Sequence, residues 1–165
     1  LRTKQQEVPL EEELEGLDDY IYLQQMRFDG RITVEKKIEA DPAAVRLPSF
    51  TLQPIVENAF SHGLKSCEEG GHILLRVWMQ GDMLVLTVAD NGIGMSREEL
   101  DALQQKITQS EQTGRSIGLG NIYRRIGMLY SDGAMKIYSR PGHGTVIRFE
   151  IPQKQSEKEG DPHEV

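Results

Sequence analysis

Four short segments combine glycines with polar side chains that are able to bind a charged, planar ligand. They are residues 57–63 (ENAFSHG), 90–95 (DNGIGM), 114–121 (GRSIGLGN) and 142–145 (GHGT). Successive landmarks in these segments are about 25 to 32 residues apart. Each segment taken alone has an ordinary structural explanation, so their order along one chain carries more information than any single one.

In the first segment, Asn58 lies among apolar neighbours on an expected helix. Its amide carbonyl is a hard oxygen ligand that suits Mg²⁺, an ion that usually keeps waters and also binds substrate phosphates. The alternative is a solvent-facing asparagine on an amphipathic helix. His62 follows one helical turn later and is expected to border the same ligand.

The second segment begins at Asp90, directly after an apolar strand. A carboxylate at a strand end accepts a hydrogen bond from an adenine amino group, and Gly92 and Gly94 let the backbone pass close to a flat ring. The alternative is a simple turn, because Asn-Gly is a strong hairpin signal. However, a hairpin requires a following strand, and here a helix capped by Ser96 is expected instead.

The third segment ends a polar loop and opens a helix at about Leu119, where free backbone amides and glycines favour an anion. Arg124 and Arg125 follow about one turn later. The alternative is a flexible linker before a solvated helix, and neither a Walker loop nor a Rossmann fingerprint is present. The fourth segment joins two strands, and its Thr145 offers a hydroxyl to a ring nitrogen in addition to serving a hairpin.

Hydrophobic periodicity predicts the elements that must position these segments. Five strands with all helices on one face make an α+β two-layer sandwich. Ser49 is the expected N-cap of the second helix. Helices are predicted at 10–27, 50–65, 96–107 and 119–130, and strands at 32–38, 73–79, 83–89, 135–139 and 145–151.

The composition favours a single soluble domain. The chain has 165 residues, a net charge of −7 and a pI near 5.1, which argues against nucleic-acid binding. No apolar run approaches the length of about 20 residues needed to span a bilayer. The lone Cys67 fits a reducing compartment. We expect residues 1–7 to end a preceding linker, 8–152 to form the domain and 153–165 to be a disordered acidic tail.

In this order, the four segments resemble the Asn box and three Gly boxes of GHKL-superfamily ATP-binding domains. More narrowly, the chain is similar to sensor histidine kinases of the LytS/YesM type in four stretches. They are EEELEGLDDYIYLQQMRF, LPSFTLQPIVENAFSHG, GLGNIYRRI and SRPGHGTVIRFEIP. The resemblance implies the Bergerat fold, with a mixed five-stranded sheet, and a site for ATP and Mg²⁺.

The resemblance also assigns expected roles. Asn58 holds the Mg²⁺ that bridges the phosphates, Asp90 selects adenine, and Thr145 supports Asp90. The segment from Leu103 to Ser116 forms a lid over the triphosphate. The full expected ATP-binding set is Asn58, His62, Asp90, Gly92, Ile93, Gly94, Met95, Gly118, Leu119, Gly120, Asn121, Arg125 and Thr145.

Several positions depart from the family pattern. Ser61 stands where a basic residue is usual, which leaves Lys65 or Arg125 as substitutes, and Ser116 replaces the first glycine of a G-x-G. Relatives that hydrolyse ATP with water carry a glutamate where this chain has Pro54. Slow or absent hydrolysis is therefore expected, with Glu57 as a catalytic helper.

The implied function is transfer of the γ-phosphate of Mg-ATP to a histidine on an upstream dimerisation helix absent from this chain. The four histidines here are poor acceptors, so the fragment is expected to bind ATP as a monomer without autophosphorylating. A response regulator is the expected partner of a full-length protein whose cytoplasmic part this is, anchored in the bacterial inner membrane. The alternatives are a non-catalytic nucleotide-sensing module of the same fold and an anti-sigma-factor serine kinase.

Overall fold

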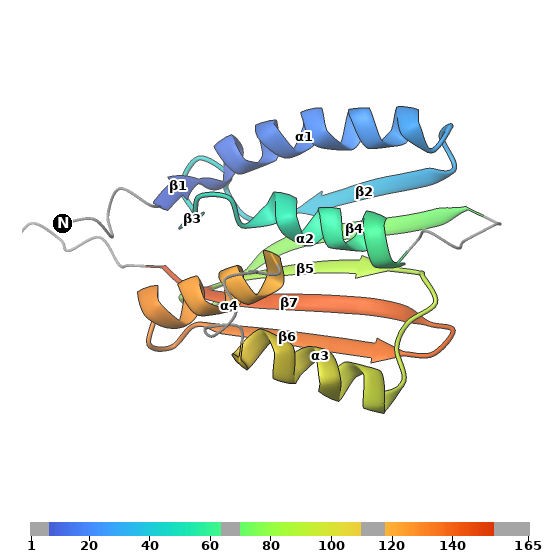
Figure 1. Cartoon of the computed structure of the whole chain (residues 1–165). Helices are drawn as coiled ribbons and strands as arrows, with labels where there is room; N and C mark the ends of the chain where they lie inside the picture. Colours follow the sequence, from blue (N-terminus) through green and yellow to red (C-terminus); the bar gives the residue numbers. More distant parts are fainter. Residues whose placement is uncertain (1–6, 64–69, 110–117, 154–165) are drawn as a thin grey trace, which may run out of the picture.

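Five strands form one mixed sheet in the order β2-β4-β5-β7-β6 (Figure 1). The computed structural model describes residues 7–63, 70–109 and 118–153 of the chain. β2 is parallel to β4, whereas the other neighbouring strands of this sheet are antiparallel. The strands are β2 (Ile32–Ile38), β4 (Gly71–Gln80), β5 (Met83–Asp90), β6 (Ala134–Arg140) and β7 (Gly144–Pro152).

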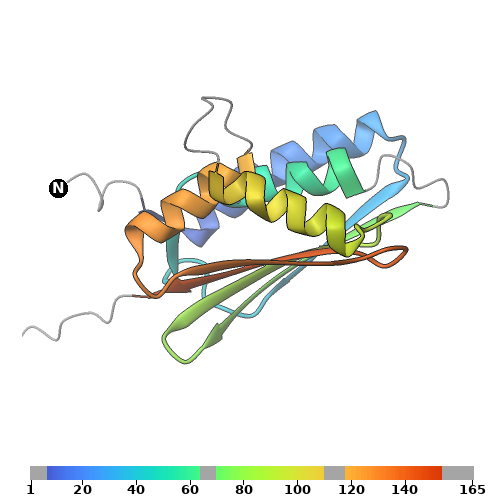
Figure 2. The same ribbon diagram turned by 60° about the horizontal axis from the view of Figure 1, so that its bottom comes forward.

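The helices lie together on one face of this sheet (Figure 2). This arrangement confirms the predicted α+β two-layer sandwich. A π-helical turn, η1, continues α2, and residues 64–65 of the predicted helix lie outside the described residues. The helices are α1 (Leu10–Arg27), α2 (Leu52–Asn58), η1 (Ala59–Gly63), α3 (Arg97–Gln109) and α4 (Gly118–Leu129).

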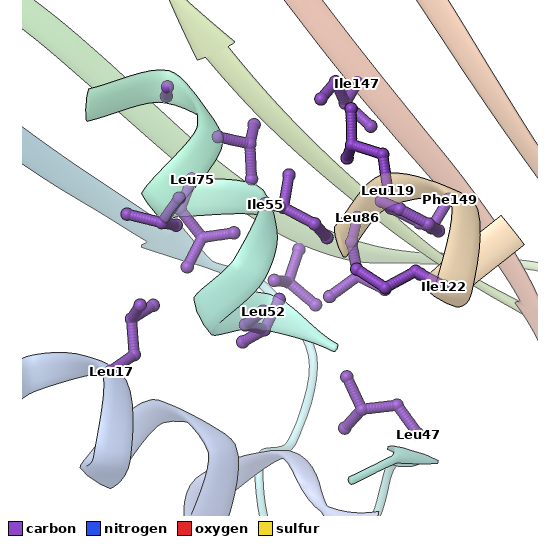
Figure 3. Close-up of a cluster of buried hydrophobic side chains, with 14 of the residues drawn as sticks. Leu17, Leu47, Leu52, Ile55, Leu75, Leu86, Leu119, Ile122, Ile147 and Phe149 are labelled. Carbon is purple, nitrogen blue, oxygen red and sulfur yellow. The ribbon is translucent and has the colours of Figure 1, made fainter. Parts of the chain in front are cut away.

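The hydrophobic core lies between the two layers (Figure 3). Leu17, Ile55 and Leu119 reach it from three helices, and Leu75 and Phe149 reach it from the sheet, each almost fully buried. Full burial of such a side chain contributes about 1.5–3 kcal/mol. The shared core therefore fixes α2 and α4 side by side on the sheet, which matters because both carry predicted site residues.

The start of α2 differs from its sequence prediction. The helix begins at Leu52, and the N-cap position is Thr51, whose side chain makes no capping bond. The predicted cap, Ser49, is therefore wrong. Instead the carboxylate of Glu13 on α1 accepts hydrogen bonds from the backbone N–H groups of Phe50, Thr51 and Leu52. A cap supplied from a distant helix is invisible to a local pattern.

A second, two-stranded sheet was not predicted because its strands are too short to show a period. It pairs β1 (Glu7–Pro9) with β3 (Arg46–Pro48) in antiparallel register. The Tyr130 hydroxyl after α4 donates to the Glu7 carboxylate at 2.8 Å. Gln153 is hydrogen bonded to the backbone of Arg46, and the rest of the predicted tail lies outside the described residues.

Candidate nucleotide site

The predicted site residues gather around a cavity above the sheet, called the first cavity below. It has a volume of about 450 Å³. Asn58 comes from the end of α2 and Asp90 from the end of β5, two elements joined only through the fold. Predicted residues that line this cavity are Asn58, Asp90, Ile93, Gly94, Met95, Leu119 and Thr145.

Asp90 has an environment unlike that of a surface carboxylate. Its Oδ1 accepts the backbone N–H of Gly92 at 2.9 Å. Burial raises the pKa of Asp90 above its ordinary value, while backbone hydrogen bonds from Gly92 and Thr145 partly lower it again. Gly92 thus serves the site by binding Asp90. The result is a half-buried acceptor aimed at a cavity, the arrangement needed to select a ligand that donates hydrogen bonds.

Two glycines bring the loop after β5 against the β6–β7 hairpin. A Cβ on Gly94, at φ +68°, would meet the Arg140 carbonyl oxygen at 2.0 Å. A Cβ on Gly144, at φ +83°, would meet the Asp90 carbonyl oxygen at 1.9 Å. Neither position tolerates a side chain, so two of the glycine segments form one tightly packed unit under the cavity.

Ser139 joins the same unit and was not predicted. Its Oγ accepts the backbone N–H of Met95 at 2.8 Å and lies 2.8 Å from the Thr145 hydroxyl. It also donates to the Gly144 carbonyl at 3.0 Å, so the Thr145 hydroxyl is the donor in their shared bond. A signal was available, since Ser139 and Thr145 are cross-strand partners beside a glycine turn.

Helix α3 contributes a wall of the first cavity, and its part from Leu103 to Gln109 belongs to the predicted lid segment, whose residues 110–116 lie outside the described residues. Glu99, Leu103 and Lys106 line the first cavity, together with Ile137 and Ile147 of the sheet. The three helical residues recur at spacings of three and four, which places them on one face of α3. That spacing, next to the loop 90–95, is the signal that could have found them.

Four of the other predicted residues line a second cavity, of about 510 Å³, between α2 and α4. Glu57, Gly118, Asn121 and Arg125 belong to it, along with Phe50, Pro54, Ile122, Arg124 and Met128. Gly120 is buried in α4 and lines neither cavity. His62 belongs to η1, but its side chain is outside the described part, as are Ser116 and Lys65.

The two cavities share a wall made of consecutive residues. Glu57 faces the second cavity and Asn58 the first, and in the same way Gly118 lines the second and Leu119 the first. Neighbouring residues on a helix point about 100° apart, because the α-helix has about 3.6 residues per turn. One turn of α2 and the first turn of α4 therefore separate two ligand-sized spaces.

The fold and the site together define a nucleotide-binding domain of the two-layer ATPase type. Residues 49–155 match the family of histidine kinase-, DNA gyrase B- and HSP90-like ATPases. The chain belongs to this family.

Similar proteins include bacterial sensors. Sensor protein LytS of Streptococcus mutans is 32% identical over 153 residues, covering 93% of this chain and 26% of that protein. Sensor histidine kinase YpdA of Escherichia coli is 30% identical over 151 residues, covering 92% of this chain and 26% of that protein. The chain thus spans about a quarter of the length of the curated relatives it matches.

Solved structures show the same fold. Histidine kinase AdeS of Acinetobacter baumannii matches with a TM-score of 0.65 at 12% identity, covering 90% of this chain and 67% of that chain. The catalytic domain of histidine kinase ThkA matches with a TM-score of 0.63 at 20% identity, covering 89% of this chain and 94% of that chain. ThkA in complex with response regulator protein TrrA matches with a TM-score of 0.62 at 18% identity, covering 90% of this chain and 41% of that chain. Within the described ranges, no helix is long and apolar enough to cross a membrane.

Proposed function

We propose that this chain is the ATP-binding part of a sensor histidine kinase, which presents the γ-phosphate of Mg-ATP to a histidine on an upstream helix. The observation that carries the proposal is Asp90, a half-buried carboxylate at a cavity bordered by two tightly packed glycine segments. The purine amino group of adenine donates the hydrogen bond that this carboxylate accepts. Ile93 and Met95, which line the same cavity, supply apolar contact for the ring.

Asn58 is the proposed ligand of Mg²⁺. Its side chain lines the first cavity and carries a hard carbonyl oxygen. No group of three or more His, Cys, Asp or Glu side chains able to hold a metal occurs among the described residues. A single amide fits this setting, because Mg²⁺ that arrives with a nucleotide takes its other oxygens from phosphates and water. When bound, Mg²⁺ neutralises phosphate charge.

The shared wall supports transfer to another group rather than to bulk water. A nucleotide in the first cavity brings its phosphates toward Asn58 and Leu119, directly beside the second cavity. An imidazole nitrogen entering there forms the P–N bond as the bond from phosphorus to the bridging oxygen breaks, and ADP leaves with that electron pair. Glu57 lines the second cavity and accepts the proton of the other ring nitrogen.

Pro54 and Lys106 refine this proposal. Pro54 lines the second cavity and has no group able to activate water, which supports slow hydrolysis. Ser61, where relatives have a basic residue, is exposed, whereas Lys106 lines the first cavity. We therefore add Lys106 to Lys65 and Arg125 as a candidate source of positive charge for the phosphates.

The direct test is calorimetric titration of the chain with a non-hydrolysable ATP analogue and Mg²⁺. Saturable binding that GTP does not compete for is the expected result, because guanine presents a carbonyl where adenine presents the amino donor. Absence of heat at a nucleotide concentration of about 1 mM, the upper end of ordinary substrate affinities, would leave the chain as a non-catalytic interaction module.

The partner and location proposals concern the longer protein. The ThkA complex supports a response regulator as the protein that receives the phosphoryl group from the histidine. We propose that the upstream dimerisation helices carry that histidine and that a preceding segment anchors the protein in the bacterial inner membrane. Phosphohistidine formation after these helices are restored tests the proposed acceptor histidine. Transfer of the phosphoryl group to a response regulator tests the proposed partner.

A further inference from the structure

The turn that begins α2 has a backbone conformation that needs support. Phe50 has φ +64°, in the left-handed region that bulky L-residues disfavour. Its side chain is 59% exposed, so burial of the ring does not hold the turn in place. The supporting interactions must therefore act on the backbone of this turn.

Glu13 supplies the first support from α1. Its Oε1 accepts the Phe50 N–H at 2.5 Å, and its Oε2 accepts the N–H groups of Thr51 and Leu52 at 3.1 Å each. Both carboxylate oxygens are used, and a carboxylate is a stronger acceptor than a neutral amide. The start of α2 is thereby tied to a helix almost 40 positions earlier.

Arg125 supplies the second support from α4. Its guanidinium donates to the carbonyl oxygens of Ser49 and Phe50, the latter at 3.5 Å. The turn is thus held by its N–H groups from one helix and by its carbonyl groups from another. Arg125 makes these bonds from a position that lines the second cavity and not the first.

We propose that Glu13 and Arg125 are positioning residues that set α2 relative to α4 and thereby place Asn58 for Mg²⁺. The turn they hold begins the helix that ends at Asn58, and Arg125 lies on the helix that begins with Gly118 and Leu119. Both sides of the wall between the cavities are therefore fixed through Phe50. This inference rests on the proposed function, and it gives Arg125 a positioning role in place of direct phosphate contact.

The test compares nucleotide affinity with Mg²⁺ and with EDTA, using a non-hydrolysable ATP analogue. Glu13→Gln keeps the side-chain size but places an NH₂ group against backbone donors. We expect it to reduce the gain in affinity that Mg²⁺ gives by about tenfold, the effect typical of groups that orient a metal ligand. Affinity in EDTA stays within about twofold, because Asp90 and the glycine segments that hold it are not in contact with Glu13 or with the turn at Phe50.

Glu12→Gln is the matched control, since Glu12 is exposed on the same helix and undergoes the same chemical change. It should keep the full Mg²⁺ gain. Circular dichroism identifies variants that are folded at the assay temperature. If Glu13→Gln is unfolded there, Arg125→Lys takes its place, because lysine retains the charge but cannot reach both carbonyls.

Arg125→Met separates positioning from phosphate contact. If Arg125 is a positioning residue, Arg125→Met reduces only the gain in nucleotide affinity that Mg²⁺ gives. The double variant with Glu13→Gln then binds the nucleotide no more weakly than the weaker-binding single variant. Additive losses of affinity, or a loss of affinity in EDTA, would mean direct phosphate contact and overturn the inference for Arg125.

A wild-type chain that binds no ATP, or binds it without any Mg²⁺ gain, refutes the proposed function instead. A normal Mg²⁺ gain in folded Glu13→Gln refutes the positioning role of Glu13 alone.

Discussion

At the scale of single residues, the site holds a carboxylate, Asp90, whose ionised form is destabilised by burial and whose hydrogen-bond donors are uncharged backbone groups. Burial raises the pKa of Asp90, so its ionised form is less favourable in the folded chain than in the unfolded chain. A folded-state pKa above the unfolded one gives stability that is present below the unfolded pKa and lost as pH rises through the folded pKa. At neutral pH the ionised Asp90 therefore weakens the fold, which is the expected cost of a binding carboxylate.

Asp90→Asn should leave the nucleotide-free chain at least as stable as the wild type at neutral pH, because it removes a desolvated charge. Any advantage should shrink as pH falls from neutral through the raised pKa of Asp90, because the wild-type carboxyl then becomes protonated. Adenine recognition should be lost, so ATP affinity falls more than triphosphate affinity. Thermal melting across this pH range measures the stability, and calorimetry measures the two affinities. Equal losses of affinity for ATP and for triphosphate would show that adenine does not bind at Asp90.

Lys106→Met tests the proposed source of positive charge in the first cavity. Methionine keeps much of the apolar stem but removes the ammonium group, so ATP should bind about three- to tenfold more weakly, as expected for the loss of one hydrogen bond worth about 0.5–1.5 kcal/mol. Adenosine should bind as before, since it carries no phosphate. Arg97→Met, at the opposite end of α3, is the control, and a parallel loss for adenosine would indicate only a packing defect.

At the scale of elements, the site depends on the contact between the loop after β5 and the β6–β7 hairpin. Gly94 and Gly144 allow their backbones to meet, and Ser139 ties Met95 to the hairpin. The Asp90 side of the first cavity is thus built on the end of β5 and the β6–β7 hairpin rather than on a free loop. Such support favours precise placement of Asp90.

Gly144→Ala and Gly142→Ala form a matched pair on this hairpin. Both glycines have positive φ, but a Cβ on Gly142 meets nothing within 4 Å, whereas one on Gly144 would lie 1.9 Å from the Asp90 carbonyl oxygen. Gly142→Ala should cost about 1 kcal/mol from backbone strain alone. Gly144→Ala should cost more than about 3 kcal/mol and reduce ATP binding. Urea unfolding gives both values, and similar losses would mean that the close approach is unimportant.

The elements also show what local sequence could and could not predict. The helices predicted from apolar periodicity do face the core, where Leu17, Ile55 and Ile126 are buried, because periodicity directly reflects burial. The Glu13 cap and Ser139 network were missed, because each joins positions that are neighbours only after folding. Likewise, spacing identified Asn58 and Asp90 as candidates, but only the fold shows that they line one cavity while Glu57 lines another.

At the scale of the whole molecule, the shared wall lies between the cavity proposed for the nucleotide and the cavity proposed for phosphoryl transfer. Two helices from different parts of the chain each present adjacent residues to both cavities. Changes on one side of the wall should therefore be separable in their effects from changes on the other. Under the proposed function, nucleotide affinity belongs to the first cavity and acceptor chemistry to the second.

Glu57→Gln examines that separation in a protein with its acceptor helices restored. ATP affinity should remain within about twofold, because the side chain points away from the first cavity. Phosphohistidine formation should slow by at least about a hundredfold, the usual contribution of a positioned base. Single-turnover kinetics and calorimetry on the same protein provide the comparison, and unchanged phosphorylation would remove Glu57 from the mechanism.

The π-helical turn η1 changes which face of the helix a residue after Asn58 occupies. A π-turn places more residues in each turn than an α-helix, so a residue three positions beyond Asn58 is rotated further from the Asn58 face. Ser61 occupies that position and is exposed. A lysine installed at position 61 should therefore fail to strengthen ATP binding. The local winding of the backbone, and not the number of intervening residues, decides which face of this helix a charge at position 61 would occupy.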